Sequence, residues 1–174
     1  VLERDLIEQG AATLAGLKTA SLFCLPLEDP DWRAQTAGWD RSLAQKGLRL
    51  LPLRCQAGRA LLYLYRPSQL QADLDCPGVG KLLARYGYGS TRAEDALSRL
   101  CQRLEEQGGF PHEIGLFLGY PLGDVEGFIR NRGQNCKCAG CWKVYCNELE
   151  AQKRFARIQK CRKVYARLWA QGRS

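Results

Sequence analysis

The residues best suited to chemistry in this chain are cysteines that gather toward its C-terminal end. Four of the nine cysteines share one short stretch, at Cys136, Cys138, Cys141 and Cys146. Thiolates at this spacing bind zinc tetrahedrally or hold an iron–sulfur cluster, because a loop lets several sulfurs converge at about 2.3 Å from a metal. A strand is expected over 141–146, and it would place Cys141 and Cys146 on opposite faces.

A zinc or iron site would therefore need three loop thiols and one further ligand. These candidate ligands are Cys136, Cys138 and Cys141, completed by His112 or Cys161. The alternative is a cysteine-rich loop that holds no metal. Cys138 and Cys141 also form a C-x-x-C pair, which is typical of redox exchange when a helix N-terminus lowers the thiol pKa. Here the pair precedes a strand, so the spacing alone does not favour that chemistry.

The only histidine, His112, lies beside Glu113 in the segment PHEIG, directly before a short apolar run. A histidine can act as general acid or base, with its second ring nitrogen oriented by a carboxylate. Adjacent side chains of an extended segment point in opposite directions, so Glu113 need not orient His112. Two interpretations stay open: a catalytic pair, or hydrogen bonds that fix the chain where it enters the next element.

Four further residues could contact a ligand near this segment. Lys18 is a candidate contact for an anionic group, and the candidates for contact with a planar ligand are Trp142, Lys143 and Tyr145. The structural alternatives are a solvated strand end for Lys18 and core packing for Trp142, because alternate residues of a strand face the interior.

The net charge of +8 is concentrated at the C-terminal end. Residues 152–173 contain eight Lys or Arg and no acidic residue, whereas the remainder has 18 basic and 18 acidic residues. Six of these cations lie away from the apolar stripe of the expected final helix: Lys153, Arg154, Arg157, Lys160, Lys163 and Arg167. Such a face can neutralise nucleic-acid phosphates. A charge run is usually a solvated helix surface, however, and we do not expect nucleic acid as a partner.

The elements that position these groups follow from hydrophobic periodicity and turn signals. Helices are expected over 3–15, 31–46 and 148–171, with three more after Pro67 and one opened by Pro121. Strands are expected over 18–25, 114–120 and 141–146, with a hairpin from 48–55 and 59–67. Pro52 should place its strand at a sheet edge or a bulge. The apolar stripe of the final helix should pack on the sheet.

These elements predict an α/β or α+β fold, a three-layer single domain over residues 1–174. The expected architecture has a mixed sheet of about five strands, one β-hairpin and a long C-terminal helix. No apolar run approaches the roughly 20 residues that span a bilayer, and the N-terminal segment VLERDLIEQG is acidic where a signal peptide is basic. We therefore expect a cytoplasmic protein with reduced thiols, and with Cys24 and Cys55 buried in apolar runs.

Five segments together resemble a bacterial family of unknown function, common in anaerobic Firmicutes and recognised by PHEIG and GYW motifs. They are TLAGLKTASLF (13–23), YRPSQLQADL (65–74), FPHEIGLFLGYPLGDVEGFI (110–129), GCWKVY (140–145) and FARIQKCRKVY (155–165). By this resemblance, Cys141 stands where the family more often has Tyr, and Cys136 and Cys138 are substitutions local to this chain. The resemblance implies membership and carries over no activity.

The leading expectation for function is a ligand- or metal-binding accessory protein, with its site near PHEIG and the cysteine-rich loop. One alternative is an enzyme that uses His112 and Glu113 as acid and base. Another is a non-specific nucleic-acid binder that acts through the basic C-terminal helix. The partner expected here is a small molecule or a metal ion.

Overall fold

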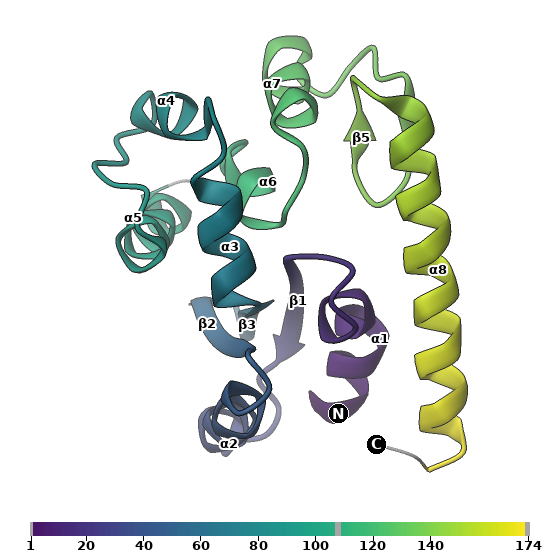
Figure 1. Cartoon of the computed structure of the whole chain (residues 1–174). Coiled ribbons are helices and arrows are strands. Elements are labelled where there is room, and N and C mark those ends of the chain that lie inside the picture. The colour runs from purple at the N-terminus through teal and green to yellow at the C-terminus, as the bar shows by residue number, and fades with distance from the viewer. Residues whose placement is uncertain (1, 107–108, 173–174) are drawn as a thin grey trace.

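The computed structural model describes residues 2–106 and 109–172, and within them the chain forms eight helices and five strands (Figure 1). β1 (Ala20–Pro26), β2 (Arg49–Gln56) and β3 (Arg59–Tyr65) form an antiparallel sheet in the order β1-β3-β2. β2 and β3 are the hairpin expected from the sequence. β2 occupies an edge, and its register shifts between Pro52 and Arg54, because proline has no N–H to donate to the ladder. Both expectations for Pro52 are confirmed.

The other two strands do not join this sheet. β4 (Cys138–Ala139) and β5 (Lys143–Val144) pair with each other in a separate antiparallel hairpin. The apolar run 114–120, expected as a strand, instead contains helix α6 (Ile114–Phe117). A short apolar run does not distinguish a buried strand from a buried helical turn. The α/β class is confirmed, whereas the single mixed sheet is wrong, since the strands form two antiparallel sheets.

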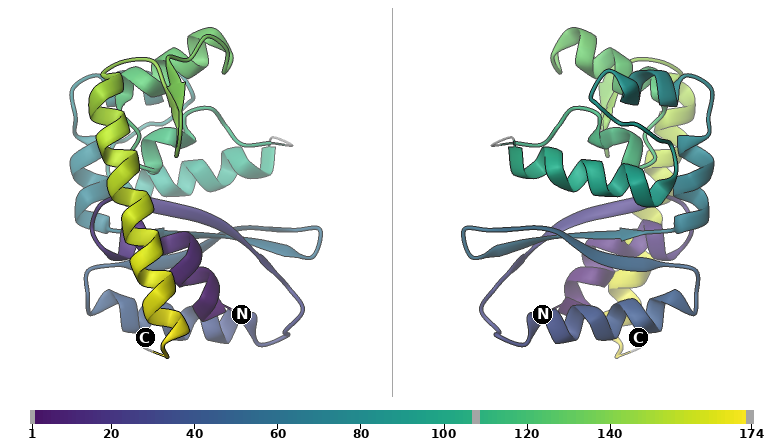
Figure 2. Two further views of the ribbon diagram at one scale, coloured as in Figure 1. Left: turned by 90° about the vertical axis from the view of Figure 1, so that its right-hand side faces the viewer. Right: turned by 90° about the vertical axis from the view of Figure 1, so that its left-hand side faces the viewer.

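The three-stranded sheet is the middle of three layers (Figure 2). Below it in that view lie α1 (Leu2–Leu14) and α2 (Trp32–Ala44). Their apolar faces meet one side of the sheet in a buried cluster that includes Leu6, Trp32, Leu43, Phe23, Leu62 and Leu64.

The opposite side of the sheet carries the helices between β3 and β4. They are α3 (Pro67–Leu74), α4 (Val79–Ala84), α5 (Ala93–Glu106), α6 and α7 (Leu122–Asn131). The buried side chains of these helices pack on the sheet around Tyr63 of β3. The Tyr63 hydroxyl donates a hydrogen bond to the carbonyl of Phe117 in α6. This contact fixes the segment after PHEIG to the sheet.

The final helix, α8 (Glu148–Ala170), runs along one side of the molecule (yellow in Figures 1 and 2). It packs along α1 and against the β4–β5 hairpin. Phe155 is buried there, with its ring centroid 4.6 Å from that of Trp142. The helix expected from the sequence is confirmed, but it does not pack on the sheet, because other helices already cover both sheet faces.

All nine cysteines are free thiols. Cys24 and Cys55, expected to be buried, are exposed. Both lie near the turn of the β2–β3 hairpin, which extends beyond the covering helices in Figure 2. Across residues 2–106 and 109–172, we find no helix that combines the length and apolar character needed to cross a membrane.

Candidate functional site

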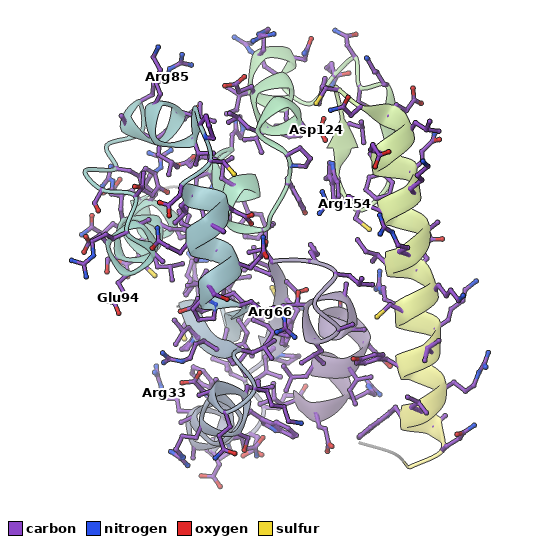
Figure 3. The ribbon with its side chains drawn as sticks, viewed as in Figure 1. Arg33, Arg66, Arg85, Glu94, Asp124 and Arg154 are labelled. Atoms are coloured by element: carbon purple, nitrogen blue, oxygen red, sulfur yellow. The ribbon has the colours of Figure 1, made fainter. Side chains whose placement is uncertain are left out.

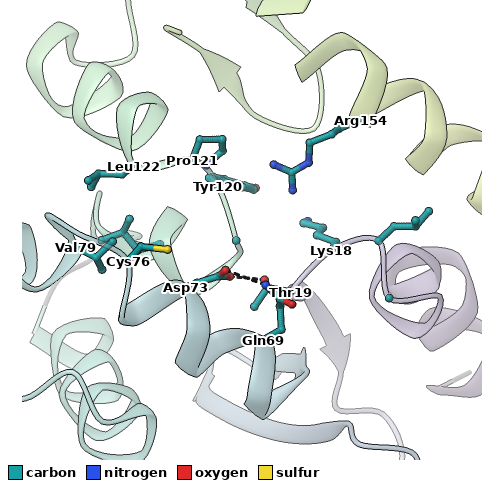
Figure 4. Close-up of a pocket in the computed structure, with 14 residues that line it drawn as sticks. Lys18, Thr19, Gln69, Asp73, Cys76, Val79, Tyr120, Pro121, Leu122 and Arg154 are labelled. Atoms are coloured by element: carbon teal, nitrogen blue, oxygen red, sulfur yellow. Dashed lines mark hydrogen bonds between the residues drawn. The ribbon is translucent and has the colours of Figure 1, made fainter. Parts of the chain in front are cut away.

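A cavity of about 420 Å³ opens where four separate segments meet (Figure 4). Its walls come from the loop between α1 and β1, from the stretch between α3 and the start of α4, from the stretch between α6 and the start of α7, and from α8. Its polar lining comprises Lys18, Thr19, Gln69, Asp73, Tyr120 and Arg154. This volume is near the lower end of the range for ligand pockets, roughly 300–1,000 Å³, so the cavity suits a small molecule. We call it the cleft.

Two cations point into the cleft from different elements (Figure 4). Lys18 extends from the loop before β1, and its ammonium lies 5.6 Å from the centroid of the Tyr120 ring. Arg154 projects inward from α8, as Figure 3 also shows, with its guanidinium carbon 4.8 Å from the centroid of the Trp142 ring. Within the described residues, neither cation has a carboxylate within ion-pairing distance.

The environment of Lys18 opposes its positive charge. Burial lowers the pKa of Lys18 from its ordinary value, and the positive charges of Arg162 and Arg154 lower it further, while Cys141 acts in the opposite direction. Burial also raises the pKa of Tyr120 to about 12, so its hydroxyl remains protonated at neutral pH. An anion placed between the two cleft cations would favour the charged form of Lys18.

Asp73 of α3 lies on a facing wall of the cleft (Figure 4). The hydroxyl of Thr19 donates a hydrogen bond to one carboxylate oxygen, and the amide of Gln69 donates to the other at 3.1 Å. Gly119 packs against Thr19 on the same wall. Its φ is +79°, and a Cβ at this position would lie 2.7 Å from the Thr19 hydroxyl oxygen, so a larger residue would not fit there. Among the residues that the structure describes, no cation pairs with Asp73. The cleft therefore presents two cations and one carboxylate that do not neutralise one another.

The PHEIG segment borders a second cavity, also about 420 Å³, which His112 lines together with mainly apolar side chains. The exposed His112 ring meets the Phe128 ring edge-on, with centroids 5.5 Å apart. Tyr120 lines both cavities. Lys18 and His112, both predicted as site residues, thus lie at different cavities with a tyrosine in common.

Glu113 points away from that second cavity. It is fully buried, and its carboxylate forms an ion pair with Arg103 of α5, whose Nη2 lies 3.4 Å from Oε2. The Tyr88 hydroxyl lies 3.5 Å from the other oxygen. Since Glu113 is committed to these partners, the geometry does not support its expected action with His112 as an acid–base pair. Its observed role is to fix the PHEIG turn to α5.

Trp142 is 5% exposed and supports the cleft from behind. Its indole N–H donates a hydrogen bond of 2.7 Å to the buried carboxylate of Asp124. Its ring stacks on Tyr120, with centroids 5.1 Å apart. Trp142, expected either to stack on a ligand or to pack in the core, packs in the core and reaches the cleft only through Tyr120 and Arg154.

The other two residues predicted around Trp142 are held by backbone groups of the chain. The Lys143 ammonium donates to the carbonyl of Gly133 at 2.7 Å, and the Tyr145 hydroxyl donates to the carbonyl of Gln134 at 2.8 Å. Lys143 lines the second cavity, whereas neither residue lines the cleft. These contacts hold the chain on both sides of the β4–β5 hairpin together.

The three cysteines predicted to bind metal lie at different points along the β4–β5 hairpin and the residues before it. Cys138 lies in β4, Cys141 lies in the hairpin turn close enough to Lys18 to influence its pKa, and Cys136 precedes the hairpin. In the part of the chain that the structure describes, no three His, Cys, Asp or Glu side chains converge as a metal site would require. The expected zinc or iron site is therefore not formed by this geometry.

The family relationship of the chain is decided by the match of residues 6–174 to a single family model, described as a protein of unknown function, DUF3793. The chain belongs to the DUF3793 family. No curated protein and no solved structure matches it. The DUF3793 match covers all the residues that form the cleft, so the cleft lies wholly within the family's domain.

Sequence reasoning found Lys18 but missed Asp73, Tyr120 and Arg154. Asp73 and Tyr120 do lie within segments that carried the family resemblance, which was a usable signal. Arg154 was expected on the solvent face of the final helix and instead faces the cleft. It directly precedes the buried Phe155, at the border of the apolar stripe, where a long side chain reaches inward.

Proposed function

We propose that this DUF3793 protein binds a small ligand in the cleft through an anionic group of that ligand, held between Lys18 and Arg154. The proposal is carried by the two cations that face one cavity and have no carboxylate partner among the described residues. Holding a charge away from water without a partner is unfavourable. A bound anion supplies the missing counter-charge for both groups at once, and charge-assisted hydrogen bonds are the stronger kind.

The wall behind these cations is suited to hold a ligand in one position. Tyr120 stacks on Trp142, and Trp142 is fixed by its hydrogen bond to Asp124. The Lys18 and Arg154 cations each lie over a ring of this aromatic pair, which restricts where they point. A preformed site loses less conformational entropy on binding.

The proposal keeps the expectation of ligand binding from the sequence, but it places the site in the cleft and not at PHEIG and the cysteine-rich loop. Lys18 remains a ligand contact, whereas the cysteine-rich loop does not line the cleft, and its Cys141 only lies close enough to Lys18 to influence the pKa of that lysine. The acid–base alternative has no comparable support, because Glu113 is occupied by Arg103. Binding is therefore the function that the geometry favours.

The experiment is calorimetric titration of the protein with inorganic phosphate, sulfate, and short mono- and dicarboxylates. We expect binding of at least one of these anions, and Lys18→Met and Arg154→Met should each weaken it about tenfold or more. Arg157→Met is the matched control, because Arg157 lies on the same helix and is exposed. The proposal is wrong if none of these anions binds, or if Arg157→Met weakens binding as much as Arg154→Met.

A further inference from the structure

The cleft has charges of both signs on facing walls. Lys18 and Arg154 lie on one side, and Asp73 on α3 lies on the other (Figure 4). A ligand that carried only negative charge would approach Asp73 against electrostatic repulsion. A site built solely for an anion would not gain from a carboxylate in this position.

Asp73 is oriented but not saturated. Each of its two oxygens accepts one hydrogen bond from a neighbouring side chain, from Thr19 and from Gln69. A carboxylate has about four acceptor positions, so each oxygen can accept one more. The two existing contacts hold the carboxylate at the cavity wall, where its remaining positions suit a ligand N–H or O–H group.

Most of the remaining lining near Asp73 is apolar and consists of Val79, Leu116, Pro121 and Leu122. Cys76 adds a thiol, which donates to the backbone carbonyl of Ala72 at 3.4 Å. These side chains suit an uncharged part of a ligand. The cavity of about 420 Å³ is large enough for a molecule of amino-acid size and small for a nucleotide or a peptide.

Resting on the proposed function, we infer that the ligand is a small zwitterion, an α-amino acid with an uncharged side chain. Its carboxylate binds between Lys18 and Arg154. Its ammonium donates hydrogen bonds to Asp73, and its side chain packs on the apolar lining. This arrangement gives every charged group in the cleft a partner of opposite sign.

The test uses pairs of probes that differ by the amine alone. L-alanine is compared with propionate, and L-leucine with 4-methylpentanoate, by calorimetric titration of the full chain. At least one amino acid should bind about tenfold or more tightly than its deaminated partner, because only the amino acid pairs with Asp73.

Asp73→Asn should remove this preference. The asparagine side-chain oxygen can still accept the Thr19 hydrogen bond, and its NH2 group can donate to the Gln69 side-chain oxygen once the exposed Gln69 amide turns over. The wall therefore keeps its shape, and the deaminated acid should bind at least as well as before. Asp75→Asn is the matched control, since Asp75 is exposed at the end of the same helix and does not line the cleft. It should keep the preference for the amine, and circular dichroism checks that both variants are folded.

The outcomes separate the two proposals. If carboxylates bind but the amine adds no affinity, or if Asp73→Asn retains the preference, the zwitterion inference is overturned while anion binding stands. If none of the anions tested above binds, the proposed function is wrong, and the zwitterion inference fails with it because it rests on that function.

Discussion

Asp124 and Trp142 are joined by a buried hydrogen bond of 2.7 Å that links α7 to the β4–β5 hairpin. The other oxygen of the Asp124 carboxylate accepts the backbone N–H groups of Tyr145 and Cys146, at 2.8 and 3.0 Å. The Cys146 thiol donates to the same oxygen at 3.3 Å, so one side chain satisfies four donors behind the wall of the cleft. Since Trp142 in turn supports Tyr120, the position of the cleft wall depends on Asp124.

Replacing Asp124 by alanine should lower the free energy of unfolding by about 2–5 kcal/mol, because buried donors would lose their acceptor. Urea denaturation measures the change. Glu126→Ala, two residues further along α7, is the control and should stay within about 0.5 kcal/mol. An Asp124→Ala variant as stable as the parent would show that this carboxylate does not hold the hairpin in place.

Glu113→Ala should also destabilise the protein strongly, by about 3–5 kcal/mol, because it leaves the mostly buried Arg103 cation without its partner. Glu105→Ala on α5, where the carboxylate is exposed, is the comparison. Both variants are measured by urea denaturation at neutral pH. Equal stabilities for these two variants would remove the structural role assigned to Glu113.

Much of the secondary structure could be predicted from the sequence, because long periodic segments carry a clear signal. The expected helix over 148–171 forms as Glu148–Ala170, and the hairpin with its bulge at Pro52 forms as expected. The strand predicted over 114–120 was wrong, because a few apolar residues fit either a strand or a helical turn. The prediction of a single sheet of about five strands was also wrong, since strand pairing is decided by contacts between distant segments.

The cleft could be predicted only in part, because its residues come from four separate segments. Lys18 was found through its charge and its place in TLAGLKTASLF, one of the segments that carried the family resemblance. Asp73 and Arg154 belong to helices whose polar residues resemble ordinary solvated faces. Only the docking of α8 on α1 and on Trp142 turns Arg154 toward the cleft.

The outer face of α8 presents a row of exposed cations that do not line the cleft: Lys153, Arg157, Lys160, Lys163 and Arg167. We expect no measurable binding to a short DNA duplex at about 50 mM or about 200 mM salt, because the rest of the chain carries no net charge to add to this attraction. Fluorescence anisotropy with a labelled duplex tests this. Binding by the wild type that is lost in an Arg157→Glu, Lys160→Glu double variant would instead establish the helix as a nucleic-acid surface.

Lys18→Met should stabilise the ligand-free protein at neutral pH, by about 0.5–2 kcal/mol, because methionine fills similar space without a charge to desolvate. Burial, and then the charges of Arg162 and Arg154, lower the pKa of Lys18 from 10.5. Between the folded-state pKa and 10.5 the unfolded chain binds more protons, so the stability contributed by this site rises with pH through that window. The advantage of Lys18→Met should therefore be complete below the folded-state pKa and disappear above pH 10.5. Urea denaturation of both proteins across this range measures it, and an advantage that does not change with pH would show that the charge of Lys18 is not what the folded state disfavours.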